Sequence, residues 1–158
     1  MAEDKEPGPE AQVTLREITS ETWYQVCILS DTLSQVQQEM VAPNAYSIAE
    51  AHFSSHAWFR AIYADETPVG FIMLHDSLDD EPGYFLWRLM VGGPHQTKGF
   101  GRRAIELLID HVRTLPGAVE LRTSCGLGEE SPEGFYQSLG FLRDGRSYGN
   151  EVGLSRAL

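Results

Sequence analysis

The sequence predicts an α/β (α+β) domain in which helices cover both faces of a central, mixed, mostly antiparallel sheet of about six to seven strands. Two observations lead to this prediction. Short β-rich runs in the middle of the chain follow one another closely, as in a meander, and a long amphipathic helical pattern then separates them from further strands, as in a crossover. In addition, 158 residues with 42% hydrophobic residues are enough for one core and too few for two ordinary domains.

The first elements follow a tail. Residues 1–12 are acidic and contain prolines, which predicts a disordered tail, and residues 13–158 then form the single domain. Val13–Ile18 alternates apolar and polar residues like a first strand. Apolar residues recur at helical spacing from Glu21 to about Gln38, with a weak patch in the middle where one helix could stop. A second, short helix is predicted over Ser47–Phe53.

Three strands and a long helix occupy the centre of the chain. Ala57–Ala64 and Pro68–Asp76 are β-rich runs separated by "DET", which is typical of a hairpin. After the polar loop "SLDDEPG", Tyr84–Val91 adds a third strand to the meander. Gly101–Val112 then places its apolar residues on one face, which predicts an amphipathic helix.

The last third of the chain alternates strand and helix before a closing strand pair. Ala118–Ser124 reads as a strand, and Ser131–Gly140 as a short helix with Pro132 near its start and a terminal glycine. The segments "FLRDGR" and "NEVGLSRAL" form the final pair. The full order is strand, helix, helix, three strands, helix, strand, helix and two strands.

Composition excludes several classes of function. The net charge of −11 argues against a nucleic-acid partner, because phosphate backbones require a basic footprint. No apolar run reaches membrane-spanning length, and the acidic N-terminus does not resemble a signal peptide, so we expect a cytoplasmic protein that does not contact membranes. Cys27 and Cys125 lie without metal-ligand spacing or a paired framework, which predicts reduced thiols and no metal site.

A glycine-containing loop joins the third central strand to the long helix. "GGPHQTK" follows Val91, and the helix begins at "GFGRR", where the first unpaired N–H groups and the positive end of the helix dipole favour an anion. Glycines there let a phosphate approach the backbone, and Lys98 and Arg102 add charge. A surface loop with turn glycines is the alternative, but strand, loop, Gly-x-Gly and basic helix start coincide.

Two well-known phosphate loops do not fit this segment. "GFGRRA" formally matches the G-x-G-x-x-A motif of dinucleotide-binding folds, in which the first glycine follows its strand almost immediately. Here seven residues separate the strand from the first glycine of the motif, Gly99. The acidic residue that this motif requires at the end of the next strand stands instead near its beginning, at Glu120. An ATP-type loop is excluded because the chain has no G-x-x-x-x-G-K-[ST] string. A pyrophosphate site in a different fold remains.

These residues resemble the GNAT superfamily of acyl-CoA N-acyltransferases. "LMVGGPHQTKGFGRRAIELL" fits the Q/R-x-x-G-x-G/A motif of that family as Gln96, Gly99 and Gly101, and "FYQSLGF" is similar to its second cofactor motif. The likeness extends from Val13 to the end of the chain and includes the order of elements. "APNAYSIAEAHF", "RAIYADETPVGFIML" and "FLWRLMV" look similar to the bacterial subgroup that contains spermine/spermidine acetyltransferases.

The resemblance implies a GNAT fold and acetyl-CoA as co-substrate, with no metal. The pantetheine would lie along a strand that splays from its neighbour, and Met90 or its neighbour would bond the acetyl carbonyl. The main-chain N–H groups of the loop would hold the pyrophosphate. The implied cofactor-binding residues are Leu89, Met90, Val91, Gln96, Thr97, Lys98, Gly99, Phe100, Gly101 and Arg102.

Tyr136 matches the position at which members of the family place a general acid. A phenol has an ordinary pKa of about 10, which suits protonation of a departing thiolate. A core tyrosine on an amphipathic helix is the alternative, and the register of "FYQSLGF" favours the acid. The chain departs from the family nearby, since Glu129 and Pro132 stand where many relatives have Asn and Ala, and Phe85 stands where some carry a glutamate.

The general base and the acceptor are less defined. Glu50, on the short N-terminal helix, and His75, at a strand end, are the two candidates for the base, and a water chain is an equal alternative. Residues 1–95 hold 4 basic and 15 acidic residues, whereas residues 96–158 hold 8 of each. This asymmetry favours a cationic amine such as a polyamine, unless the acidic residues serve only solubility.

Aromatic residues could add to an acceptor site. Tyr46 and Trp87 offer cation–π faces beside Glu50, although both could also be core or interface aromatics. The sequence therefore predicts an N-acetyltransferase acting on a small-molecule primary amine. The alternative is a sensor or inactive module that binds CoA or acyl-CoA, against which Tyr136 argues, and a homodimer remains open.

Overall fold

The computed structural model describes residues 5–76 and 83–158. The first four residues of the predicted tail and residues 77–82 of the predicted polar loop lie outside the described residues. The strands are β1 (Val13–Arg16), β2 (Ala57–Ala64), β3 (Thr67–His75), β4 (Tyr84–Val91), β5 (Glu120–Cys125), β6 (Leu142–Tyr148) and β7 (Glu151–Ala157). The helices are α1 (Trp23–Ile28), α2 (Gln35–Met40), α3 (Asn44–His52), α4 (Phe100–Arg113) and α5 (Glu133–Ser138), with short 3-10 turns η1 (Leu29–Thr32) and η2 (Gly93–His95).

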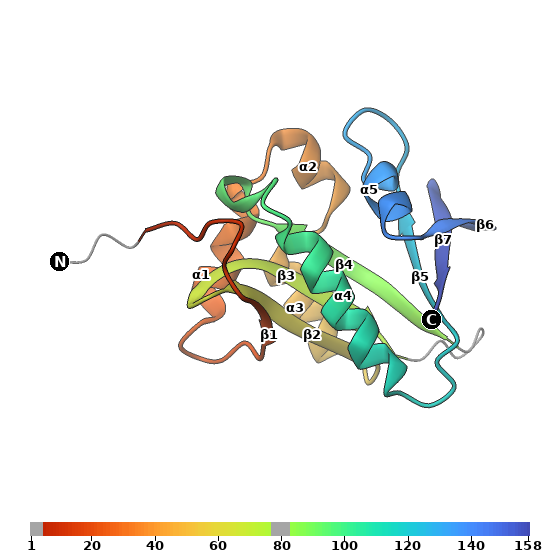
Figure 1. Cartoon of the computed structure of the whole chain (residues 1–158), viewed down its shortest axis with the longest axis horizontal. Coiled ribbons are helices and arrows are strands. Elements are labelled where there is room, and N and C mark those ends of the chain that lie inside the picture. Colours follow the sequence, from red (N-terminus) through yellow and green to blue (C-terminus); the bar gives the residue numbers. More distant parts are fainter. Residues whose placement is uncertain (1–4, 77–82) are drawn as a thin grey trace.

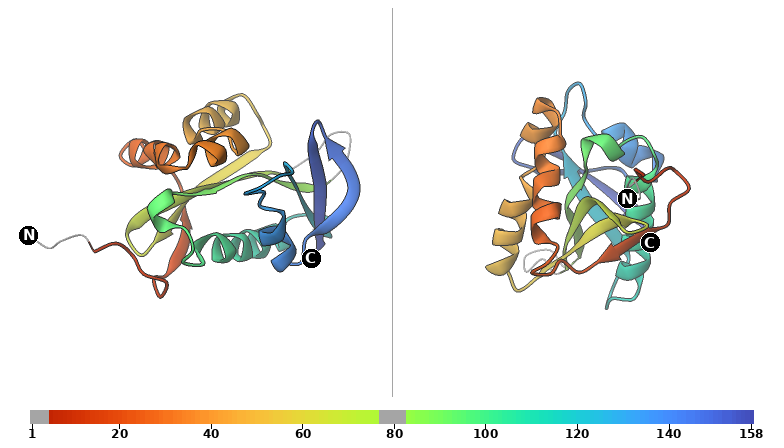
Figure 2. Two further views of the ribbon diagram at one scale, coloured as in Figure 1. Left: turned by 90° about the horizontal axis from the view of Figure 1, so that it is seen from above. Right: turned by 90° about the vertical axis from the view of Figure 1, so that its left-hand side faces the viewer.

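The seven strands form one sheet in the order β1-β2-β3-β4-β5-β7-β6. Every neighbouring pair is antiparallel except β4 and β5, which run parallel because α4 connects them as a crossover. Figure 1 shows α4 crossing one face of the sheet, and Figure 2 shows α1 and α3 on the opposite face. The predicted mixed, mostly antiparallel sheet with helices on both faces is confirmed.

Each face of the sheet has its own apolar core because side chains alternate along the strands. Beneath α4, Ile105 and Leu108 pack with Leu74, Leu86 and Leu121 of the sheet, all at most 2% exposed. On the other face the buried cluster contains residues of α1, β2, β3 and β4, among them Val26, Ala61, Phe71, Met73 and Met90. The two cores fix β4 from both sides.

The N-terminal helices differ from the prediction in detail. The segment from Glu21 to Gln38 is not one helix, because α1 ends at Ile28 and a 3-10 turn and Leu33 follow. Ser34 then starts α2, accepting from the N–H of Gln37 while the Gln37 side chain accepts from the N–H of Ser34. The structure thus places the break where the sequence pattern was weak.

Residues 7–12 correct the prediction of a disordered tail. Ala11 is only 3% exposed and packs in the core under α4. Arg103 on α4 donates to the carbonyls of Ala11 (2.6 Å) and Pro9 (2.8 Å), and Lys98 donates to the carbonyl of Pro7 (3.0 Å). These main-chain contacts fix the segment although its composition is typical of a tail.

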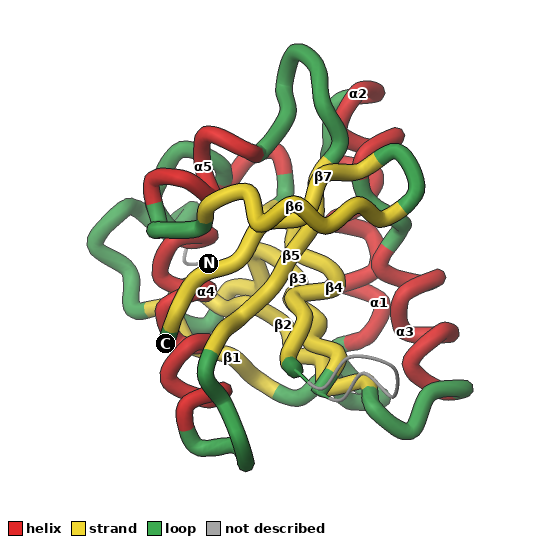
Figure 3. The backbone as a smooth tube through the Cα atoms, turned by 90° about the vertical axis from the view of Figure 1, so that its right-hand side faces the viewer, coloured by secondary structure: helices red, strands yellow, loops and turns green. Residues whose placement is uncertain are grey.

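The two parallel strands diverge soon after they meet. β4 and β5 pair only at Tyr84 with Leu121 and at Phe85 with Arg122, and the Thr123 hydroxyl then donates to the carbonyl of Leu86 at 3.1 Å. β4 continues to pair with β3 as far as Val91 on its other side. Figure 3 shows β7 and β6 completing the sheet beyond β5. The divergence leaves one edge of β4 open above Leu86.

Candidate active site

A cavity of about 1010 Å³ lies where β4 and β5 separate. Its walls come from β4, the loop before α4, the first turn of α4, β5 and α5, and α2 and the β6–β7 hairpin complete it. The sequence-predicted cofactor residues that line it are Leu89, Met90, Val91, Gln96, Thr97, Gly99, Phe100, Gly101 and Arg102. Of the ten predicted cofactor residues, only Lys98 does not line the cavity.

The loop before α4 is held by its own side chains. Gln96 donates to the carbonyl of Val91 at 2.9 Å and exchanges two amide hydrogen bonds of 3.2 Å with Gln37 on α2. Thr97 adopts a left-handed φ of 66°, which is uncommon for a residue with a side chain. The loop is therefore a fixed, partly strained structure rather than a flexible connection.

The start of α4 presents backbone to the cavity. Gly99 is the N-cap with φ 82°, a conformation that favours glycine. A Cβ on Gly101 would lie 3.4 Å from Phe135 Cζ and 3.6 Å from Val91 Cγ2, so a longer side chain there would enter the cavity. Because the first N–H groups of a helix have no intrahelical acceptor, this turn can bind an anion through its main chain.

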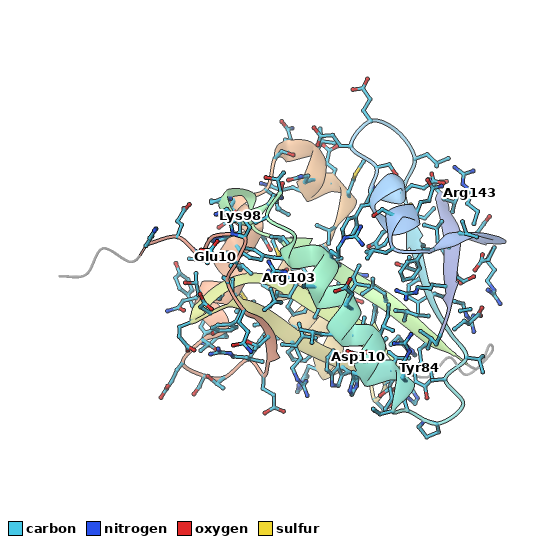
Figure 4. All side chains as sticks on the ribbon, viewed as in Figure 1. Glu10, Tyr84, Lys98, Arg103, Asp110 and Arg143 are labelled. Carbon is cyan, nitrogen blue, oxygen red and sulfur yellow. The ribbon has the colours of Figure 1, made fainter. Side chains whose placement is uncertain are left out.

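The charged side chains of the loop take different directions. Arg102 lines the cavity and donates to the Ser138 hydroxyl of α5 at 2.9 Å. Lys98 instead turns to the N-terminal segment, where its Nζ lies 3.0 Å from the Pro7 carbonyl and 4.0 Å from a Glu6 carboxylate oxygen. Figure 4 shows Lys98 and Arg103 beside that segment. The Lys98 side chain therefore lies outside the cavity lining, and its contact with a cofactor stays a prediction.

Tyr136 projects from α5 into the base of the cavity and is 6% exposed. Its ring packs on Phe135 and Phe141, with centroids 5.5 and 5.6 Å away. Burial raises the pKa of Tyr136 to about 12, although a hydrogen bond with the Thr123 side chain lowers it in part. Burial likewise raises the pKa of the Cys125 thiol beside it. Tyr136 is thus a protonated donor inside the cavity.

The predicted base and acceptor residues are mostly elsewhere. Glu50 forms an ion pair of 3.1 Å with Arg88 and does not line the cavity. His75 contacts the rings of His56 and Trp87, each 5.5 Å away, and is also outside the lining. Tyr46 is 68% exposed and outside it as well, whereas Trp87 is in the wall. Glu50, His75 and Tyr46 therefore lie outside the cavity lining, and their predicted roles stay predictions.

The β6–β7 hairpin contributes to the cavity, which its sequence did not predict. Tyr148 and Glu151 both line the cavity, together with Ser124 and Phe85. β7 lies between β5 and β6 in the sheet, so these residues reach the site through a non-local pairing. The only local signal was the "YGNE" turn, which predicts a hairpin but not where it packs.

Within residues 5–76 and 83–158, no group of three or more His, Cys, Asp or Glu side chains could hold a metal ion. In the same residues, no helix has both the length and the apolar character needed to cross a membrane.

The fold and site together define an acyltransferase of the acetyl-CoA type. A family model described as "Acetyltransferase (GNAT) family" matches residues 14–141. The chain therefore belongs to the GNAT acetyltransferase family, whose members are acetyl-CoA-dependent N-acetyltransferases. A search of curated protein sequences finds no significant match.

Solved structures with the same fold share little sequence with the chain. An acetyltransferase from Thermus thermophilus has a TM-score of 0.74 at 16% identity, covering 93% of this chain and 97% of that one. An aminoglycoside 6′-N-acetyltransferase in complex with coenzyme A has a TM-score of 0.69 at 17% identity, covering 92% and 96%. The ribosomal-protein-S18-alanine N-acetyltransferase of Escherichia coli has a TM-score of 0.65 at 18% identity, covering 93% of both chains.

Proposed function

We propose that the protein transfers the acetyl group of acetyl-CoA to a primary amine by direct attack in a ternary complex. One observation carries the proposal. The cavity between β4 and β5 connects the exposed backbone at the start of α4 with the Tyr136 hydroxyl, so that one elongated ligand can reach both. An anion site at one end and a proton donor at the other suit a CoA thioester.

The cofactor would be held mainly by the main chain. The N–H groups from Gln96 to Arg102 would bind the pyrophosphate, and Arg102 would add charge from the cavity wall. The free edge of β4 at Leu89–Val91 would pair with the pantetheine and polarise the acetyl carbonyl. The glycines at 99 and 101 support this role because neither places a side chain between ligand and backbone.

Tyr136 would act when the thioester breaks. The amine nitrogen attacks the carbonyl carbon, the C–N bond forms, the C–S bond breaks, and the phenol donates its proton to the departing thiolate. The amine releases its own proton through water, which returns a proton to the Tyr136 phenolate, and neither Glu50 nor His75 lines the cavity to act as a base. A raised phenol pKa keeps the donor protonated at any ordinary assay pH.

The acceptor proposed here is a cationic amine, and a polyamine in particular. Among the described residues, three carboxylates line the cavity, those of Glu39, Glu130 and Glu151. The lining arginines are Arg102, on the cofactor side, and Arg88, whose charge is paired with Glu50. Burial lowers the pKa of His95, so that residue adds little positive charge at neutral pH. Glu130 lies beside the cofactor loop, near Gln37 and Gln96, so it is Glu151, on β7, that can attract a cation away from that loop.

Thiol release from acetyl-CoA with a panel of amines tests the proposal. We expect turnover with spermidine and simple diamines, slower turnover with acidic amino compounds, and a kcat/KM that falls as ionic strength rises. A protein that binds CoA in calorimetry but releases no thiol with any amine would be a CoA sensor, which is the alternative function. Equal turnover of cationic and anionic amines would reject the polyamine assignment alone.

The location proposed is the cytoplasm. Cys27 and Cys125 are both free thiols, and Cys125 lies in the cavity wall, where oxidation would obstruct the site. A reducing compartment keeps such thiols intact. Fractionation of cells that express the full chain tests this assignment, and recovery from an oxidising compartment would reject it.

A further inference from the structure

The β6–β7 hairpin brings two polar groups to the cavity on the side away from α4. Tyr148 ends β6, Glu151 begins β7, and the two residues face each other across the pair. Both line the cavity. Neither belongs to the cofactor loop or to the helix that carries Tyr136, so their presence in the wall needs its own explanation.

The Glu151 carboxylate is fixed but not neutralised. The Ser124 hydroxyl donates to its Oε1 at 2.8 Å, which orients the carboxylate from the neighbouring strand β5. Among the described residues no cation pairs with Glu151. The nearby arginines have other partners, because Arg146 pairs with Asp144 and Arg122 with Glu120. A carboxylate in a cavity wall without a cation favours a positively charged ligand.

The Tyr148 hydroxyl lies beside it with its hydrogen-bonding capacity unused. The oxygen is buried and has no hydrogen-bond partner among the described residues. The ring is held by an edge contact with Phe85 on β4, with centroids 5.1 Å apart. A buried hydroxyl without a partner loses free energy, so a ligand that donates to it recovers that loss.

We propose that Glu151 and Tyr148 bind the ammonium group of the acceptor. This inference rests on the proposed acetyltransferase function and names the residues of its acceptor site. The Ser124 proton is already committed to Glu151, so the remaining Glu151 lone pairs and the Tyr148 oxygen are acceptors, which match the three donors of a primary alkylammonium. An anionic acceptor would meet the same carboxylate with like charge.

The position of the carboxylate relative to Tyr136 supports the inference. The negative charge of Glu151 contributes to raising the pKa of both Tyr136 and Cys125, after the larger effect of burial. The carboxylate is therefore close enough to the proposed general acid for the two to interact. An ammonium bound at the hairpin would first lose a proton to water, and the neutral nitrogen would then attack a thioester held between β4 and β5.

Calorimetric titration of the CoA-loaded protein with spermidine, and with n-butylamine as a monoamine, tests the site without requiring turnover. Glu151→Gln keeps the acceptor atom for Ser124 and removes the charge, so its Kd should rise about tenfold to a hundredfold, as expected for a lost charged hydrogen bond. Tyr148→Phe keeps the contact with Phe85 and should raise the Kd about twofold to tenfold. Glu106→Gln makes the same charge change at an exposed position of α4, and this control should bind like the wild type.

The outcomes separate this inference from the proposed function. The inference is overturned if the wild type binds neither amine, or if Glu151→Gln binds both amines as tightly as the wild type does. Thermal unfolding of each variant distinguishes a lost site from a lost fold. A wild type that binds amines through Glu151 but releases no thiol from acetyl-CoA would reject the acetyltransferase function and retain the site. If Glu151→Gln acetylates the amine with an unchanged KM, the acetyltransferase function is retained and the ammonium site at Glu151 is rejected.

Discussion

Removal of the Tyr136 hydroxyl is expected to slow acetyl transfer without disturbing the fold. In Tyr136→Phe the ring keeps its contacts with Phe135 and Phe141. Thr123 keeps its hydrogen bond to the Leu86 carbonyl at 3.1 Å, so no buried group is left without a partner there. The cost in the free energy of unfolding should then stay near the value of one ordinary hydrogen bond, about 0.5–1.5 kcal/mol.

The expected loss of rate is much larger. A positioned proton donor contributes about 10²- to 10⁴-fold, which corresponds to about 2.7–5.4 kcal/mol of activation free energy. The pKa of Tyr136 is raised to about 12, chiefly by burial, so the phenol stays protonated through the usual assay range. The ratio of wild-type to variant kcat should therefore be the same at every pH from about 6 to about 10.

Steady-state thiol release measures kcat, and calorimetry measures the Kd for CoA, which should not change. Tyr24→Phe is a matched control, because that tyrosine is 62% exposed on α1. Tyr136 is not the proton donor if kcat of Tyr136→Phe equals that of the wild type, or if the entire loss is a weaker affinity for CoA. Either result would return Tyr136 to a purely structural role in the core.

Three further predictions concern the same cavity. The pKa of Tyr136 is about 12 in the folded chain and about 10 in the unfolded chain, so the folded chain holds this proton more tightly. The contribution of Tyr136 to the unfolding free energy should therefore be fully present below pH 10 and fall by roughly 2–3 kcal/mol towards pH 12, as measured by urea titrations. Tyr136→Phe should make the fall smaller by about this amount, while the buried thiols of Cys27 and Cys125 keep their own contribution, and an identical fall in the variant would contradict the assignment. Gly101→Val should raise the Kd for CoA about tenfold or more by filling the cavity near Phe135, and a normal Kd would place the pyrophosphate elsewhere. Lys98→Ala should change the Kd for CoA less than about threefold, and Arg102→Ala should change it more, because of these two side chains only Arg102 lines the cavity. A larger effect of Lys98→Ala than of Arg102→Ala would contradict the described side-chain directions.

Local patterns explain the parts of the fold that could be predicted. The hairpin over β2 and β3, the strand β4 and the amphipathic helix α4 each depend on periodicity and turn residues within a short window. The observed bounds of α4, Phe100–Arg113, extend the predicted helix by one residue at each end. The glycine-containing loop was recognisable for the same reason, because its residues are consecutive in the chain.

The acceptor side could not be predicted, because it depends on contacts between distant segments. Tyr148 and Glu151 reach the cavity only because β7 inserts between β5 and β6, and nothing in their own neighbourhood indicates this. Glu50 was a reasonable candidate on its short helix, yet Arg88, 38 residues away, holds its carboxylate. Side-chain patterns also could not show that residues 7–12 are ordered, since main-chain carbonyls make the contacts that hold them.

The N-terminal contacts have a consequence for how this segment tolerates change. The carbonyls of Pro7, Pro9 and Ala11 accept from Lys98 and Arg103, and every amino acid supplies the same carbonyl. We expect single substitutions at positions 7 and 9 to leave the contacts intact, whereas inserting or deleting one residue between 7 and 11 would put the carbonyls out of step with both cations. The identity of residues 7 and 9 is therefore expected to be free to change, whereas the number of residues between 7 and 11 is not, and Ala11 is also constrained by its burial in the core.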